Sequence, residues 1–249
     1  MRREIVAEIA KGRRRHDMLL ALGVGMIVLM WASLSQPNVE DELAAGYSAL
    51  LYALPLMNTI VMPISMAALA SRLWDMEAKA GSLKLVFTLQ SRVSLFAGKA
   101  LVGMAQIALI GAVEIAGLLA IGRWQGFTEP LPVPHVAWLL ASTLVVNAML
   151  FFAELCICVH SDTQVAALGA GAVFSLVGVF GAFMPPVMTY FMPWAYYMPL
   201  GSVKMNWDSV TRICTFEMLP FSGTILAVGA ALLALFALLA WRAIDNKEV

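Results

Sequence analysis

Two glutamates lie inside long apolar runs of the sequence. Glu114 is the only charged residue of the run 101–121, and Glu154 is the only charged residue of the run 136–159. A charged group at the centre of a membrane is costly, so such residues usually face the interior of a helix bundle or a wet cavity. The two glutamates are therefore candidates for a substrate path or for proton coupling. Polar groups that only satisfy one another, or a partner helix, give the same pattern.

Other polar side chains accompany these glutamates. Thr143, Asn147 and Glu154 fall within about 40° of one another on a helical wheel and would form a polar stripe. Asn58 lies between two prolines of an earlier run, where proline removes a backbone hydrogen bond and kinks a helix. The candidate substrate-path residues are Asn58, Glu114, Thr143, Asn147 and Glu154.

Catalytic and nucleotide-binding motifs are missing from the sequence. Gly98-Lys99 lacks the upstream glycine of a Walker A loop, and neither G-x-S-x-G nor H-E-x-x-H occurs. The three histidines are scattered without metal-ligand spacing. The chain is therefore predicted to have no catalytic residues, no metal site and no ATP hydrolysis of its own.

Six apolar runs supply the elements that would position these residues. Hydrophobic residues make up 61% of the 249 and charged residues 13%, whereas a soluble domain has about 25% charged residues. Each run holds 17 to 24 residues, and a helix needs about 20 to cross the hydrocarbon layer. The sequence predicts an all-α integral membrane protein with one domain over 1–249 and spans at about 18–34, 47–69, 101–121, 136–159, 165–184 and 223–241.

Lys and Arg are distributed unequally between the two sides of these spans. Thirteen of the 16 fall on one side, and Arg123, Lys204 and Arg212 fall on the other. The positive-inside rule places the basic side in the cytoplasm, so both termini of this multi-pass plasma-membrane protein are expected there. The basic clusters are interpreted as topology signals and lipid-headgroup contacts, not as a nucleic-acid surface.

Two segments beside the spans have an interfacial character. Residues 1–16 have the pattern of a basic amphipathic helix that lies in the headgroup layer, although a basic flank for insertion has the same composition. Residues 185–222 combine five prolines with Tyr and Trp, which settle at membrane interfaces. Short interfacial or re-entrant helices are expected there on the extracellular face, as an aromatic belt or as a lid over the substrate.

The fifth run is lined with small residues, which let helix backbones approach closely in lipid. The pattern does not say whether the partner helix belongs to this chain or to another subunit. The helix-packing residues are Gly171, Ser175, Gly178 and Ala182.

The loop 71–97 between the second and third spans holds a short amphipathic segment. Leu83, Val86 and Phe87 would give it one apolar face, and Ser91 is a plausible N-cap for the helix that becomes the third span. A short helix between two spans suits docking into a groove on a soluble partner.

This loop resembles that of ABC-2 type transporter permeases. Glu77, the pair Gly81-Ser82, the apolar helix, the run Thr88-x-x-Ser91-Arg92 and Lys99 entering a span follow the family pattern, while Gln90 stands where the family often has proline. The family has six spans, an N-terminal interfacial helix, a cytoplasmic coupling helix and interfacial helices before the last span. Within it, the length, this loop and Phe191-Met192-Pro193-Trp194 most resemble the lantibiotic-protection (immunity) permeases.

The resemblance implies a cytoplasmic ABC ATPase that binds ATP and magnesium, with no cofactor in this chain. It also implies a second permease, identical or similar, and export of an amphipathic antimicrobial peptide. Phe87 is expected to be the main docking anchor, and Glu77 to pair with the ATPase or with Lys79, Lys84 or Arg92. The implied ATPase-coupling residues are Glu77, Gly81, Leu83, Val86, Phe87, Ser91 and Arg92.

Three other functions stay open. An ion-coupled secondary transporter would use Glu114 and Glu154 and need no ATPase. An ABC-2 system could also export a different lipophilic substrate. A membrane scaffold would have no transport activity.

Overall fold

The computed structural model describes residues 16–34, 39–41, 43–78, 83–161, 163–181, 184 and 186–247. Apart from His16, the predicted helix at 1–16 lies outside these residues, as do Gly81 and Ala182. Within the described residues, six helices are long and apolar enough to cross a membrane: α2 (Asp17–Leu34), α3 (Gly46–Ala78), α5 (Arg92–Gln125), α6 (Val133–Ser161), α7 (Gln164–Gly181) and α9 (Gly223–Asp245). The predicted all-α membrane fold with six spans is confirmed.

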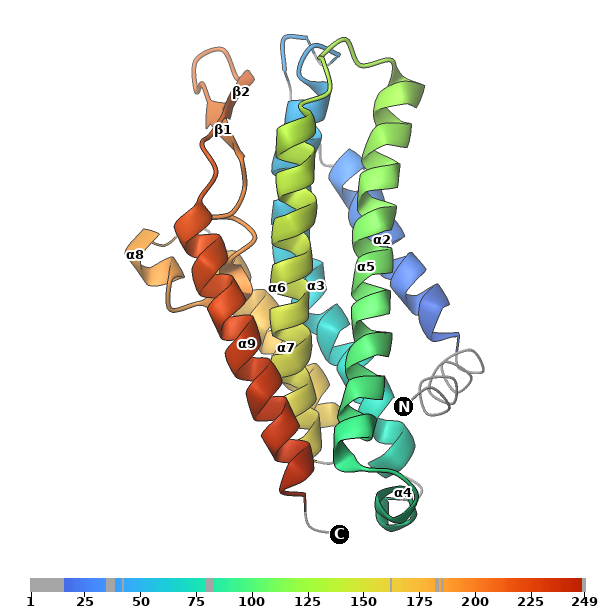
Figure 1. Cartoon of the computed structure of the whole chain (residues 1–249). Helices are drawn as coiled ribbons and strands as arrows, with labels where there is room; N and C mark the ends of the chain where they lie inside the picture. Colours follow the sequence, from blue (N-terminus) through green and yellow to red (C-terminus); the bar gives the residue numbers. More distant parts are fainter. Residues whose placement is uncertain are drawn as a thin grey trace.

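The long helices run side by side, and α6 contacts α3, α5, α7 and α9 (Figure 1). The short helix α4 (Leu83–Leu89) lies at one end of the bundle. Helix α2 begins and α9 ends at that same end, because six spans return the chain to the side on which it started. We call it the α4 end.

Helices α3 and α5 are longer than a membrane requires. They have 33 and 34 residues. At 1.5 Å per residue each is about 50 Å long, against about 30 Å of hydrocarbon. Each is therefore longer than the hydrocarbon layer is thick, and α4 connects them at the α4 end.

Helix α7 packs directly on α3. A Cβ atom added at Gly171 would lie 2.7 Å from the Ala67 Cβ and 3.0 Å from the Pro63 carbonyl oxygen. At Gly178 it would lie 3.1 Å from the Thr59 Cγ2. The two glycines thus allow close contact with the proline-containing part of α3, and their partner helix belongs to the same chain.

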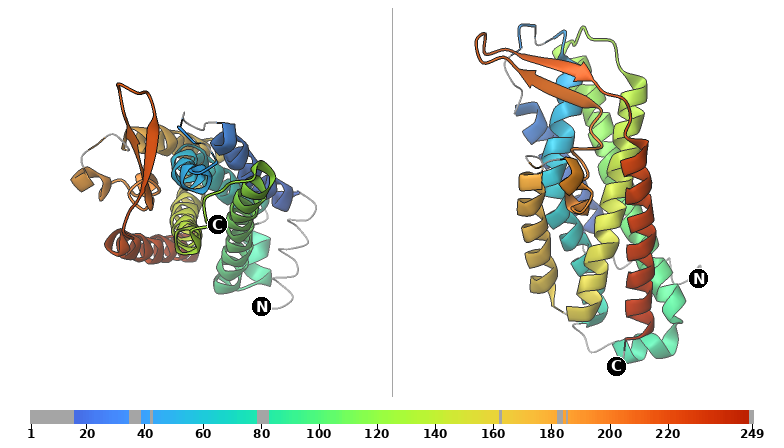
Figure 2. Two further views of the ribbon diagram at one scale, coloured as in Figure 1. Left: turned by 90° about the horizontal axis from the view of Figure 1, so that it is seen from above. Right: turned by 90° about the vertical axis from the view of Figure 1, so that its left-hand side faces the viewer.

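The segment before the last span is only partly helical. It contains α8 (Pro186–Thr189) and the 3₁₀ turn η1 (Pro193–Ala195). It then forms a hairpin of β1 (Val203–Trp207) and β2 (Cys214–Met218), which pair antiparallel from Val203–Met218 to Trp207–Cys214. Short helices were expected here and the hairpin was not. Figure 2 shows that the hairpin projects beyond the bundle at the end opposite α4.

The turn of this hairpin is closed by Asp208. Its Oδ1 accepts a hydrogen bond of 2.8 Å from the Val210 backbone N–H. This bond, together with one from the Thr211 side chain, holds the pKa of Asp208 below its usual range. The carboxylate therefore accepts hydrogen bonds from turn donors that have no partner on the opposite strand, as aspartate commonly does in turns.

Candidate functional site: a buried ion pair and a central polar cluster

A buried ion pair joins α3 and α5 at the α4 end. The Lys99 Nζ lies 2.8 Å from the Glu77 Oε2 and donates a second hydrogen bond of 2.5 Å to the Leu73 carbonyl. Lys99 is 0% exposed and Glu77 1%. The ammonium also lies 5.8 Å from the centre of the Trp74 ring. Near the C-terminus of α3 a cation is favoured by the helix dipole as well as by the carboxylate.

The ion pair corrects the expected role of Glu77. The sequence places Glu77 in a loop, free to meet an ATPase or a basic residue of that loop. In the structure it belongs to the last turn of α3, and its burial against Lys99 keeps it off the surface of the permease. Glu77 is therefore placed to hold α3 against α5, and its side chain is not part of the exposed surface of this chain.

Helix α4 turns its predicted docking face toward the bundle. Leu83 is buried, and Val86 and Phe87 are half-buried and pack against the apolar core. The guanidinium of Arg92 lies 5.0 Å from the centre of the Phe87 ring. Phe87 thus anchors α4 to the bundle with part of its side chain, and its expected contact with a partner stays a prediction.

The exposed face of α4 carries two other leucines. Leu85 is 60% exposed and Leu89 75%. Four residues apart, they lie on the same side of the helix. Sequence reasoning missed this pair, although its spacing is visible in the run Leu83–Leu89. Ser91 then caps α5, as predicted, by accepting a hydrogen bond of 3.3 Å from the Ser94 backbone N–H.

A second group of polar side chains lies inside the bundle. The Asn58 Nδ2 donates a hydrogen bond of 3.2 Å to the Glu114 Oε2, which links α3 to α5. The Tyr197 hydroxyl donates one of 2.5 Å to the Asn147 Oδ1, which links the segment after η1 to α6. We call Asn58, Glu114, Asn147 and Tyr197 the central polar cluster.

Thr143 and Glu154, the other residues of the predicted stripe on α6, are also buried. Among the described residues, neither forms a hydrogen bond with the central polar cluster. Thr143 is 2% exposed and Glu154 0%. Among the described residues, neither carboxylate oxygen of Glu154 has a hydrogen-bond partner. Since the cluster residues are at most 3% exposed, a substrate could reach them only if the helices moved apart.

Tyr197 is the member of the cluster that the sequence did not single out. It stands in an aromatic segment that predicts only an interfacial position. Its hydroxyl reaches Asn147, 50 residues away in the chain, because η1 folds back against α6 and α7. No local pattern encodes such a contact.

Comparison with known families decides what kind of membrane protein this is. Residues 4–182 match the model of the ABC-2 family transporter protein, and the match covers more than two thirds of the chain. The chain belongs to the ABC-2 transporter family. No curated protein matches it by sequence.

The permease is therefore the membrane component of an ABC transport system and not itself catalytic. Its family implies an ABC ATPase as partner. Among the described residues of the permease, no group of three or more His, Cys, Asp or Glu could hold a metal ion. The match ends near the end of α7, so the hairpin and α9 lie outside it.

Proposed function

We propose that the permease assembles with a second, identical or similar permease and with cytoplasmic ATPase subunits that bind ATP and magnesium. The complex exports an amphipathic peptide, of the lantibiotic or bacteriocin class, for self-protection. The substrate class rests on the resemblance of the coupling loop and of Phe191-Met192-Pro193-Trp194 to lantibiotic-protection permeases.

The exposed leucines of α4 carry the ATP-driven part of this proposal. Leu85 and Leu89 are exposed on α4, which stands between the ends of α3 and α5 in the chain. Burying a leucine side chain in a partner's groove is worth about 1.5–3 kcal/mol. Two such leucines on one helical turn suit docking against an ATPase surface, with Lys84 beside them on the exposed face.

The buried ion pair gives α4 a rigid connection to the centre of the bundle. Phe87 and Val86 fix α4 to the core, and Lys99 with Glu77 fixes α3 to α5 close by. The same two helices carry Asn58 and Glu114. Movement of α4 by an ATPase is thus passed along α3 and α5 to the central polar cluster.

The aromatic segment before the hairpin suits a substrate that enters from the membrane. Trp194 stacks on Phe174 of α7, with ring centres 4.6 Å apart and planes 7° apart, which holds the segment on the bundle. Phe191 remains 80% exposed and Tyr190 43%. An amphipathic peptide offers both apolar and polar groups to such a surface.

A pull-down from the native host in mild detergent, followed by an ATPase assay of the eluate, tests the coupling. Replacing Leu85 and Leu89 with alanine should remove most of the co-purified ATPase activity. The matched control replaces Leu235 and Leu238, which are also exposed in this chain but lie on the spanning helix α9, and it should leave that activity unchanged. Equal yields from both double variants would contradict the docking face.

An export assay tests the substrate and separates the rival functions. Cells that make the complex should survive a lantibiotic, and a defect in the ATP site of the partner should abolish that protection. Efflux that follows a pH gradient without ATP would favour the ion-coupled transporter. Protection from other lipophilic compounds, without protection from a lantibiotic, would support an ABC transporter but contradict the proposed peptide substrate.

A further inference from the structure

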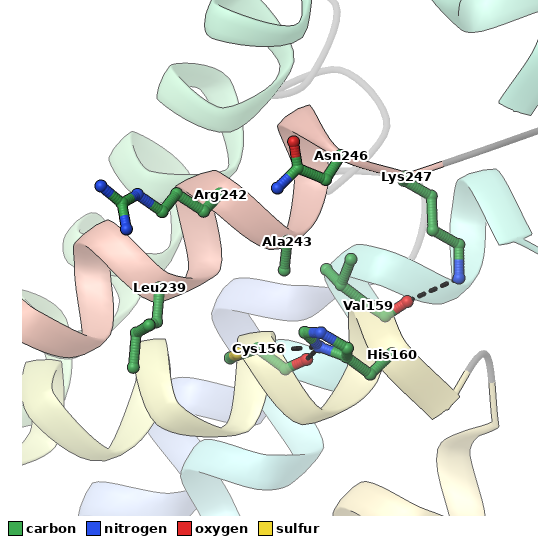
Figure 3. A pocket seen from close by; sticks show the side chains of 8 residues that line it. All are labelled: Cys156, Val159, His160, Leu239, Arg242, Ala243, Asn246 and Lys247. Atoms are coloured by element: carbon green, nitrogen blue, oxygen red, sulfur yellow. Dashed lines mark hydrogen bonds between the residues drawn. The ribbon is translucent and has the colours of Figure 1, made fainter.

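An open groove lies between α6 and α9 at the α4 end, with a volume of about 420 Å³ (Figure 3). Its floor is apolar and includes Val159 of α6 with Leu239 and Ala243 of α9. Neither the coupling of α4 nor the central polar cluster uses this groove.

The rim of the groove is basic. Arg242 lies toward one end in Figure 3, while Lys247 and His160 lie toward the other. Arg242 is exposed, and its guanidinium has no hydrogen bond or ion pair within the described part of the chain. Asp245 is the acidic neighbour of Arg242 on α9, but it does not line the groove.

The other two rim residues are held in place by the end of α6. The Lys247 Nζ donates a hydrogen bond of 2.7 Å to the Val159 carbonyl, which brings its charge to the groove. The His160 Nδ1 lies 2.8 Å from the Cys156 carbonyl, which orients the ring. A group bound here would therefore meet the fixed ammonium of Lys247 on one side and the exposed guanidinium of Arg242 on the other.

We infer that this groove binds the phosphate headgroup of an anionic phospholipid, with an acyl chain along the apolar floor. The groove opens at the level where these two spans end, and basic pockets between spanning helices are known to bind such headgroups. Its combination of an apolar floor and a basic rim matches a lipid, whereas a free phosphate ion would use the rim alone. The bound lipid bridges α6 and α9. Of the six candidate spans, α9 has the smallest share of residues buried by the rest of the chain.

Lipid binding to the purified full-length permease, measured by native mass spectrometry, tests this site. Phosphatidylglycerol should be retained better than phosphatidylcholine. Arg242→Gln should weaken its binding about fivefold, the factor expected for one basic contact with an anionic lipid. Arg242→Lys should keep most of the binding. Lys84→Gln, which removes an exposed charge from α4 at the same end and lies outside the groove, is the matched control and should leave the retention of phosphatidylglycerol unchanged.

Two further measurements distinguish the possible ligands and control for folding. A phosphatidylglycerol with a photoreactive acyl chain should label the peptide that contains Leu239 and Ala243, while circular dichroism of Arg242→Gln stays unchanged. Equal retention of the two lipids, or equal weakening by Lys84→Gln and Arg242→Gln, would overturn the site. Displacement of the lipid by millimolar inorganic phosphate, without acyl-chain labelling, would make it a phosphate site instead.

Discussion

Glu77 and Glu154 are buried to the same extent but have opposite surroundings. Glu77, 1% exposed, meets the ammonium of Lys99 at 2.8 Å. Glu154, 0% exposed, has no hydrogen-bond partner for either oxygen among the described residues. A buried carboxylate without compensation costs several kcal/mol unless it takes up a proton, a water or a new partner.

This contrast distinguishes two regions of the bundle. At the α4 end, buried charges are compensated by opposite charges. Asp17 is a second example, because its Oδ1 lies 2.7 Å from a guanidinium nitrogen of Arg72. Paired charges of this kind hold helices in one arrangement. Inside the bundle, Glu154 and the unpaired atoms of Asn58 and Asn147 leave capacity for further hydrogen bonds. The first region thus has compensated buried charges, and the second has buried polar atoms without a partner among the described residues.

Breaking the Lys99–Glu77 pair should have the largest effect. Lys99→Met removes the ammonium from the buried carboxylate of Glu77, and breaking a buried ion pair typically costs about 3–5 kcal/mol. We expect a much lower midpoint of thermal unfolding in detergent. Lys99→Met combined with Glu77→Leu removes both charges and should recover most of the stability. A single variant as stable as the parent would show that the pair does not hold α3 to α5.

Breaking the Asp17–Arg72 pair should have a smaller effect of the same sign. Arg72 keeps a side chain that is 34% exposed, so water can partly replace it. Arg72→Met leaves a buried acceptor on Asp17, and we expect a loss of about 1–3 kcal/mol in the same unfolding assay. A loss larger than that of Lys99→Met would reverse the ranking of the two pairs.

Glu154→Gln should change function more than stability. The amide has nearly the same shape and cannot carry the charge, so we expect the free energy of unfolding to stay within about 1 kcal/mol. Peptide protection should fall several-fold. Glu114→Gln, which keeps an oxygen for the Asn58 amide, is the comparison within the central polar cluster. If Glu154→Gln instead prevents stable expression, the residue serves packing and not transport.

Thiol labelling should show which end of the bundle faces the outside of the cell, without affecting stability. Cys214 belongs to the segment 185–222, which the sequence predicts to be extracellular. Its side chain is buried at 3% exposure and should react slowly with an impermeant reagent. Val210 in the hairpin turn is 89% exposed. Val210→Cys should therefore react rapidly in intact cells, if the α4 end is cytoplasmic. Labelling only after the membrane is opened would invert the topology.

The six helices could be predicted because lipid leaves the backbone few choices. In hydrocarbon every N–H and C=O must bond within the segment, so a run of about 20 apolar residues becomes a helix. The predicted runs lie within the observed helices, except that the fifth extends to residue 184 while α7 ends at Gly181. The hairpin escaped prediction because its strands have five residues each, too few to show a pattern among prolines and aromatics.

The sequence alone determined the spans, the cap of α5 by Ser91 and the presence of buried carboxylates, since each depends on residues close together in the chain. The tertiary structure decided which side chains meet: Glu77 with Lys99, Asn58 with Glu114, and Asn147 with Tyr197. It also decided that Phe87 faces the core while Leu89 faces outward. A helical wheel gives angles between residues of one helix, but the neighbour that each face meets depends on how all the helices pack together.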